Sequence, residues 1–248
     1  MLENEIRAVA VVSQKGSRSA QEDHVVINEQ KRVFVIADGF GGPAPGALAS
    51  KSACDEVGNF LVREMGDQDA TLPFVLRSYF SLAGNVLFNA LIHANRKLLR
   101  LNQGKGVHER GGASVLAGFM DGDLLALASA GSCTAWLIRG GQTAELVMPR
   151  TYGRLVDPFA RSAAKTEHQI PLTALGLSED LEPEIFEYRI RRGDWLLIQT
   201  DGLPDSVRLQ TAEIQTQGLD GAASVAAFKK VCSAAQSDDN LSGSLIIF

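Results

Sequence analysis

The sequence predicts a single α+β domain that combines long helices with antiparallel strands. Residues 46–66 and 71–101 repeat apolar positions at the spacing of amphipathic helices. From residue 111 the pattern changes to short apolar segments separated by glycine-containing turns, which is typical of antiparallel strands. The 248 residues are 45% hydrophobic, and no Pro/Gly/Ser-rich linker or charge block divides them. We therefore expect one domain over residues 1–248.

Two apolar runs lead directly into an Asp-Gly pair. Residues 33–37 form a β-branched and aromatic run that we expect to be a buried strand ending at Asp38, followed by Gly39. A second apolar run leads to Asp201 and Gly202. An isolated Asp-Gly is usually a plain turn. A carboxylate at a strand end can also bind a cation, with a glycine carbonyl as a second oxygen ligand.

The remaining elements are short. Further strands are expected at residues 6–13, 25–27, 114–120, 124–129, 134–139, 144–147 and 245–248, and a last helix at residues 220–236. The four segments between residues 114 and 147 predict an antiparallel meander. Asp205 is expected to cap the start of a helix, and His93 to be a core or surface residue of its helix.

Composition excludes several classes of function. The net charge of −5 and the isoelectric point near 5.4 disfavour nucleic acid and anionic membranes as partners. No apolar run approaches the ~18 residues of a membrane span, and the N-terminus lacks the basic region of a signal peptide. Cys54, Cys133 and Cys232 have no metal-binding spacing. We expect a cytoplasmic protein.

Four acidic motifs follow one another along the chain. They are Arg18 with Glu22 and Asp23; Asp38 to Gly42; Gly193 and Asp194 leading to Asp201; and Asp239 with Asn240. Together they resemble the PPM (PP2C-type) metal-dependent Ser/Thr phosphatases, whose pattern is Arg-x-x-Asn-Glu-Asp, Asp-Gly-x-Gly-Gly, Gly-Asp leading to Ser-Asp-Gly, and Asp-Asn-x-Thr. The resemblance covers nearly the whole chain. It implies an α/β/β/α sandwich of two antiparallel sheets flanked by helices, with a metal cleft at one edge.

The resemblance also implies a two-ion centre. The implied ligands are Glu22, Asp23, Asp38, Gly39, Asp201 and Asp239. Carboxylate oxygens without thiolates or paired histidines select Mg²⁺ or Mn²⁺. Arg18 and Asp38 are the implied catalytic residues, and Arg18 and Asn240 the implied substrate-binding ones. The planar fork of arginine suits a phosphate, although Arg18 taken without the resemblance is more often a solvated loop residue.

The chain departs from the family pattern at three positions. Ser132 replaces an aspartate that is linked in many members to a third, weaker metal, so we expect two ions and no third of comparable affinity. Phe40 stands where some members have a histidine proposed as general acid, so another donor must protonate the leaving group. Gln21 replaces an asparagine and should affect only loop contacts.

Residues 149–171 correspond to the variable flap of the family. Its basic residues, Arg150, Arg154, Arg161 and Lys165, either steer an acidic phosphopeptide into the cleft or form an ordinary solvated loop. The sequence leaves both readings open.

The expected function is hydrolysis of phosphoserine or phosphothreonine on proteins by water activated between two Mg²⁺ or Mn²⁺ ions. The expected partners are a phosphorylated protein and a cognate Ser/Thr kinase, as for compact bacterial members that include those of type VI secretion clusters, and the chain is expected to be a monomer. A non-catalytic phosphoprotein-binding regulator with the same fold is the alternative, and a phosphatase of a small regulatory domain, as in sigma-factor control, is another. The chain has neither a Cys-x5-Arg motif nor a nucleotide-binding Gly-x4-Gly-Lys-Ser/Thr loop.

Overall fold

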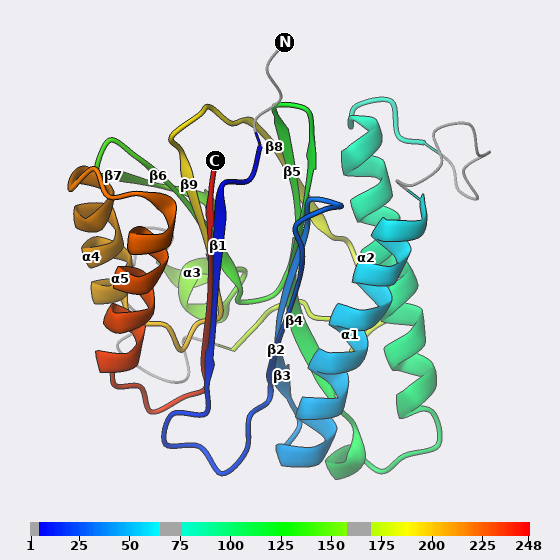
Figure 1. Ribbon diagram of the computed structural model, residues 1–248. Helices are drawn as coiled ribbons and strands as arrows, with labels where there is room; N and C mark the ends of the chain where they lie inside the picture. Colours follow the sequence, from blue (N-terminus) through cyan, green and yellow to red (C-terminus); the bar gives the residue numbers. More distant parts are fainter. Residues whose placement is uncertain (1–4, 65–75, 158–169) are drawn as a thin grey trace.

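The structure, a computed structural model, describes residues 5–64, 76–157 and 170–248. Two five-stranded antiparallel sheets pack face to face, and a helix pair covers the outer face of each (Figure 1). The first sheet contains, in spatial order, β1 (Ala8–Gln14), β10 (Leu241–Ile247), β9 (Trp195–Gln199), β6 (Thr134–Arg139) and β7 (Gln142–Val147). The second contains β2 (Asp23–Asn28), β3 (Val33–Phe40), β4 (Gly112–Asp121), β5 (Leu124–Ala130) and β8 (Glu184–Arg189).

The helices complete the four layers. The second sheet is covered by α1 (Pro43–Glu64) and α2 (Leu82–Asn102), and the first by α4 (Asp205–Thr216) and α5 (Gly221–Ala234). A 3₁₀ turn (Val107–Glu109) follows α2, and the short α3 (Tyr152–Val156) follows β7. The predicted α/β/β/α sandwich is therefore confirmed. Within the described part of the chain, no helix is both long and apolar enough to cross a lipid bilayer.

Three apolar layers hold the sandwich together, and β3 takes part in two of them. Val33, Val35 and Ala37 face the helix pair, whereas Phe34 and Ile36 face the other sheet. All five are fully buried, which explains why this strand is a continuous apolar run rather than an alternating one. Burial of each large side chain stabilises the fold by about 1.5–3 kcal/mol. A third layer joins the first sheet to α4 and α5.

The second long helix begins later than expected. Residues 71–75 of the predicted helix lie outside the described residues, and the segment just before α2 is a turn. Ser81 caps the helix, because its Oγ accepts a hydrogen bond from the amide of Gly84 at 3.0 Å. Asn85 then folds back to bond the carbonyls of Arg77 and Phe80. These polar contacts fix the turn before α2, so the helix begins at Leu82.

Three further expectations need correction. The four strands between residues 114 and 147 do not form one meander, because β4 and β5 belong to one sheet and β6 and β7 to the other. Gly131, at φ 117°, allows the change of sheet, and a side chain there would collide with Ser114. Strand β3 continues through Phe40, so Asp38 lies within a strand and not at its end. Asp205 is the first residue of α4 and pairs with Arg208 at 3.2 Å instead of capping the helix.

The predicted flap contains α3 in its described part. Arg161 and Lys165 lie outside the described residues. Arg154 on α3 pairs with Glu145 at 2.8 Å, and its side chain is only 17% exposed. Arg150 is 50% exposed and lies 3.6 Å from Glu184. His93 is a half-exposed residue of α2, beside Glu56 at 3.3 Å.

Candidate metal centre

The predicted acidic residues converge where the ends of the two sheets meet. Asp23 opens β2 and is the direct cross-strand partner of Asp38 in β3. Asp201 follows β9, and Asp239 precedes β10 in the other sheet. Since β10 and β1 both lie against β2, carboxylates from both sheets face one another across the seam between them.

A cleft of about 460 Å³ opens at this seam. Its walls include almost all the predicted site residues, namely Arg18, Glu22, Asp38, Gly39, Asp201, Asp239 and Asn240. Other lining residues are Phe40, Ser114, Ser132, Ile170 and Pro171. Asp23 does not line the cleft. Its side chain is buried against the same group of carboxylates.

Asp23 has one carboxylate oxygen without a partner. The Thr200 hydroxyl donates to Oδ2 at 3.0 Å, while Oδ1 is buried and makes no hydrogen bond. Burial raises the pKa of Asp23 to about 6. An unsatisfied buried oxygen is costly, and a cation is the ligand that such an acceptor lacks.

Asp38 and Asp201 are perturbed in the same direction. Burial, followed by the charges of Asp201 and Asp23, raises the pKa of Asp38 well above its usual range. Burial and the charge of Asp239 raise the pKa of Asp201 to about 7. Carboxyls that resist ionisation because of one another are stabilised as anions when cations sit among them. The group therefore has the electrostatics of a divalent-ion site.

The donor set fits magnesium or manganese. Within the described ranges, no three side chains of His, Cys, Asp or Glu are arranged around a single metal position. An ion here would take one or two carboxylates and complete its shell with backbone carbonyls, such as that of Gly39, and water. This is the usual coordination of Mg²⁺, and the lining donors are oxygens.

Glycines bring β3, α1 and Glu22 into close contact. The amide of Gly39 donates to the carbonyl of Glu22 at 3.1 Å. A side chain on Gly39 would collide with the carbonyl of Gly46 in α1, and one on Gly46 would collide with the Glu22 carboxylate. Both glycines therefore keep Glu22 at the edge of the cleft.

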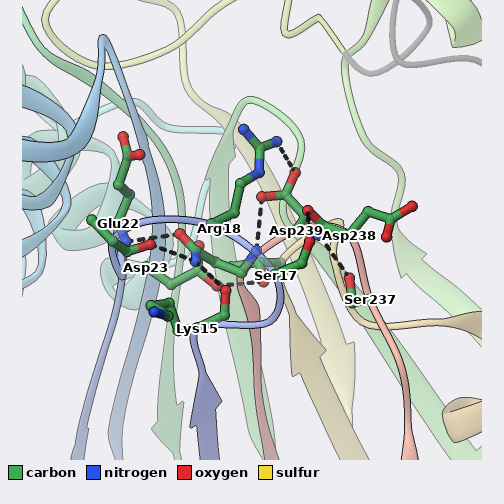
Figure 2. Close-up of polar contacts among 11 residues, drawn as sticks. Lys15, Ser17, Arg18, Glu22, Asp23, Ser237, Asp238 and Asp239 are labelled. Carbon is green, nitrogen blue, oxygen red and sulfur yellow. Dashed lines mark hydrogen bonds and ion pairs between the residues drawn. The ribbon is translucent and has the colours of Figure 1, made fainter.

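Arg18 is held over the cleft by Asp239. Its Nη2 donates to Oδ2 of Asp239 at 2.7 Å, and the arginine side chain remains 49% exposed (Figure 2). The loop that carries Arg18 packs on the segment before β10, where Ser17 bonds the carbonyl of Asp238 at 3.2 Å. Arg18 thus has a fixed partner and a guanidinium that still faces solvent.

Asn240 has a different place from the one expected. Its Nδ2 donates to the carbonyls of Lys15 and Ala20, both at 2.8 Å, and its Oδ1 accepts from the amide of Glu22 at 2.8 Å. The residue is 4% exposed. Because both donors and the acceptor are occupied by backbone groups, the geometry does not support a substrate contact. Asn240 instead ties the Arg18 loop to the start of β10.

Two of the three positions that depart from the family pattern, Phe40 and Ser132, line the cleft. Ser132 is buried, donates to Ser114 Oγ at 3.1 Å and contacts the carboxylate of Asp201. Phe40 packs its ring against Gly112, so position 40 offers no proton donor. Asp123 lies in the β4–β5 turn, at the other end of β4, and pairs with Arg189 at 2.6 Å, so it does not supply the carboxylate that Ser132 lacks.

Sequence reasoning missed the hydroxyl and amide groups around Asp23. Thr200 bonds Asp23, and Gln21 donates to Ser13 at 2.6 Å. Ser242 in turn donates to Ser13 at 3.1 Å. Small polar residues inside otherwise apolar strands were the available signal, since such strands bury them only where they find a partner.

This fold, with carboxylates gathered at the seam of the two sheets, is that of the PPM phosphatases. The sequence is 26% identical over 199 residues to the serine/threonine protein phosphatase PstP of Mycobacterium tuberculosis, a match that covers 78% of this chain and 35% of PstP. It is 24% identical over 211 residues to the protein phosphatase PhpP of Streptococcus pneumoniae, covering 82% of this chain and 80% of PhpP. This chain therefore spans about a third of the length of PstP. No family model matches the sequence.

Solved structures agree on the fold. The crystal structure of PstP superposes with a TM-score of 0.77 at 22% identity, covering 97% of each chain. PppA, described as a key regulatory component of the type VI secretion system of Pseudomonas aeruginosa, gives 0.76 at 20% identity, covering 99% of this chain and 98% of PppA. The PstP catalytic domain has also been solved in complex with 2 manganese ions. The resemblance to the PPM family is thus confirmed.

Proposed function

We propose that this protein is a metal-dependent protein phosphatase that hydrolyses phosphoserine and phosphothreonine. The observation that carries the proposal is the convergence of Asp38, Asp201 and Asp239 on one cleft, with the buried Asp23 against them and one of its carboxylate oxygens unsatisfied. A site that only bound phosphate would contain positively charged side chains rather than a group of carboxylates. The names of PstP and PhpP support the same activity.

Two ions, Mg²⁺ or Mn²⁺, would be held by the carboxylates of Asp38, Asp201 and Asp239, with Glu22 or Asp23 and the carbonyl of Gly39. When bound, such ions lower the pKa of the attacking water and neutralise charge on the phosphate. The charges of Asp201, Asp23 and Asp239 all raise the pKa of Asp38, so its carboxylate would hold an ion together with these neighbours. The manganese complex of PstP supports the choice of metal.

Arg18 docks the phosphate. Its Nη2 is bonded to Asp239 at 2.7 Å, and the rest of its fork remains open to the cleft. A guanidinium anchored at one corner can orient a phosphate with its other N–H groups. The anchoring carboxylate also keeps the long side chain ordered, which lowers the entropy lost on binding.

The leaving alkoxide is protonated by water in this proposal. Phe40 cannot donate a proton, and the lining residues Ser114 and Ser132 are hydrogen-bonded to each other. General acid assistance is typically worth about 10² to 10⁴-fold. We therefore expect slower turnover than in relatives that carry a histidine at this position, and two ions with no third of comparable affinity.

The biological setting is proposed by analogy with the bacterial relatives. The substrate is a phosphoprotein, the opposing enzyme is a Ser/Thr kinase, and the chain acts as a cytoplasmic monomer in bacterial signalling. The competing function is a non-catalytic regulator that binds phosphoproteins through the same fold.

One assay separates the two functions. Purified protein is stripped with EDTA, and turnover of p-nitrophenyl phosphate and a phosphothreonine peptide is measured with and without added Mn²⁺. A phosphatase gains activity with Mn²⁺ and loses it on chelation. Full turnover by the stripped protein would contradict the metal-dependent mechanism. Phosphopeptide binding without turnover at any Mn²⁺ concentration would favour the regulator.

A further inference from the structure

A larger hollow of about 970 Å³ lies along α2. Ile170 and Pro171 line the metal cleft, and the next two residues, Leu172 and Thr173, line this hollow. One wall is formed by α2 and the turn before it, and the other by residues 172–183. We call this hollow the α2 groove. The segment of residues 170–173 therefore connects the rim of the metal cleft to the rim of the α2 groove.

The wall formed by residues 172–183 is fixed to α2. The buried Asn95 donates to the carbonyl of Ser178 and accepts from the amide of Gly176, both at 2.8 Å. Asn102 donates to the carbonyl of Gly176 at 3.2 Å. The amide of Leu172 bonds the carbonyl of Arg150 at 2.9 Å. The groove therefore exists before any ligand arrives, which reduces the ordering cost of binding.

Large apolar side chains lie exposed in the groove. Tyr79 is 73% exposed and packs edge-on against Phe80 at 4.5 Å between ring centroids. Leu177, on the opposite wall, is 56% exposed. Phe88 also lines the groove, beneath the guanidinium of Arg77 at 3.7 Å. Exposed aromatic groups beside a preformed hollow are the usual anchors of protein recognition.

The charges of the groove are divided between its walls. Arg77 and Arg96 lie on the α2 side, whereas Glu179, Asp180 and Glu182 lie on the other wall. At the cleft end, Arg150 lines the groove and is half exposed, and it lies 3.6 Å from Glu184. An extended peptide with an apolar anchor, and with an acidic residue close to the phosphorylated one, matches this arrangement.

We propose that the α2 groove binds the polypeptide that flanks the phosphorylated residue of the substrate. One apolar side chain of that segment packs against Tyr79 near the start of α2, and another packs against Leu177, which follows Gly176 beside Asn95 in the C-terminal half of α2. An acidic side chain approaches Arg150. This inference rests on the proposed phosphatase function. It specifies the substrate as a protein segment several residues long, in contrast to a small phosphoester, which would fill only the metal cleft.

The test compares a short and a long substrate. p-Nitrophenyl phosphate reports on the metal cleft alone, and a pool of 15-residue peptides with a central phosphothreonine and randomised flanks reports on both sites. Tyr79→Ala and Leu177→Ala should each raise the KM for the peptide pool about tenfold and leave both kcat and the turnover of p-nitrophenyl phosphate unchanged. Leu209→Ala is the matched control, because Leu209 is 53% exposed on α4, away from the groove.

An unchanged peptide KM in both groove variants would overturn the proposal. A concentration-dependent dimer that Tyr79→Ala dissociates in sedimentation would assign the groove to a second copy of the chain and would also overturn it. Failure of the phosphatase function gives a different result, namely no turnover of p-nitrophenyl phosphate by the wild type. In that case, the fluorescence anisotropy of the fluorescein-labelled peptide pool tests the groove directly. Weaker binding of the peptides by Tyr79→Ala than by the wild type supports the groove as a binding site, and unchanged binding refutes it.

Discussion

Asp38 and Asp201 reach the same cleft from different sheets and by different means. Asp38 lies inside β3, paired on one side with Asp23 and on the other with Ser114. Asp201 lies in a turn after β9, where the amide of Leu203 bonds the carbonyl of Thr200 at 3.3 Å. The first carboxylate is positioned by strand pairing on both sides, and the second by a turn.

The glycine after each aspartate serves the same purpose at both places. A side chain on Gly39 would collide with the carbonyl of Gly46, and one on Gly202 with the carbonyl of Asn240. In each case the glycine lets a neighbouring segment approach the backbone next to a carboxylate. In both Asp-Gly pairs, therefore, the glycine allows a second chain segment to pack closely beside the aspartate, in a strand as well as in a turn.

Neutralising either aspartate should have the largest effect. Asp38→Asn and Asp201→Asn keep the shape of the side chain but remove the charge that holds a cation. Because even changes to residues behind metal ligands cost about 10 to 100-fold, we expect kcat/KM for p-nitrophenyl phosphate to fall by more than about 100-fold. Asp38→Asn should be the more severe, since Asp38 is coupled to three other carboxylates.

The control for this pair is the stability of the metal-free protein. Both variants should unfold at the same or a higher temperature than the wild type in EDTA, because one member of a repelling group has been neutralised. Wild-type kinetics for Asp201→Asn would show that this residue does not serve as a metal ligand.

The glycine comparison predicts a loss of stability. Gly39→Ala and Gly202→Ala each place a methyl group against a backbone carbonyl, and such overpacking typically costs about 1–3 kcal/mol. Gly39→Ala should cost more, because β3 is paired on both sides and cannot shift, whereas the turn at Gly202 can relax. Urea unfolding in EDTA measures both.

Gly58→Ala is the matched control for these variants. Gly58 lies within α1, and a side chain there would meet only Val26 at an ordinary 3.5 Å. Alanine favours a helix by up to about 1 kcal/mol over glycine, so this variant should be as stable as the wild type or more so. A similar loss in all three variants would mean that the collisions are not the cause.

The sequence predicts local structure well and the assignment of strands to sheets poorly. The β3 run was recognisable because a strand buried on both faces must be apolar throughout. The change of sheet between β5 and β6 was not recognisable. The turn around Gly131 would have the same composition if β6 paired with β5 in one sheet as it has now, when β6 joins the opposite sheet. The start of α2 was also missed, because Ser81 and Asn85 stop the helix through contacts that apolar spacing does not reveal.

The candidate site shows the same division. Glu22, Asp38, Asp201 and Asp239 were identified from motifs, and the fold brings them to one cleft. The place of Asn240 was not foreseen, because a hydrogen-bonding side chain looks alike in sequence whether it meets a substrate or a backbone carbonyl. Side-chain partners distant in the chain, such as Thr200 for Asp23, are fixed by strand register, which local pattern does not specify.

A pH dependence of stability should distinguish the metal-free from the metal-bound protein. The pKa is raised to about 6 for Asp23 and to about 7 for Asp201, against about 3.9 in an unfolded chain. A raised carboxyl pKa stabilises the fold below the unfolded value, and that stability is lost as the pH rises through the folded value. In EDTA, the free energy of unfolding contributed by these groups should therefore decline between about pH 4 and pH 7.

The measurement is the urea midpoint at several pH values, with and without Mn²⁺. Added Mn²⁺ should remove the decline, because it stabilises the ionised carboxylates. Asp201→Asn should make the decline shallower in EDTA, since one titrating group is gone. If the free energy of unfolding declined as steeply in Asp201→Asn as in the wild type, Asp201 would be excluded as the source of the decline.

The smallest expected effect concerns Ser132, which contacts Asp201 and bonds Ser114 at 3.1 Å. A hydroxyl offers one uncharged oxygen, so the wild type should bind two ions without a third of comparable affinity. Ser132→Asp adds a carboxylate beside Asp201 and should create an additional low-affinity phase in a calorimetric Mn²⁺ titration. Ser132→Asn has nearly the same shape without the charge and should lack this phase, which separates the effect of charge from that of packing. Because Asp123 is paired with Arg189 at the far end of β4, it cannot take the place of the missing aspartate. Three fully occupied manganese sites in wild-type crystals grown at low Mn²⁺ would contradict this interpretation of Ser132.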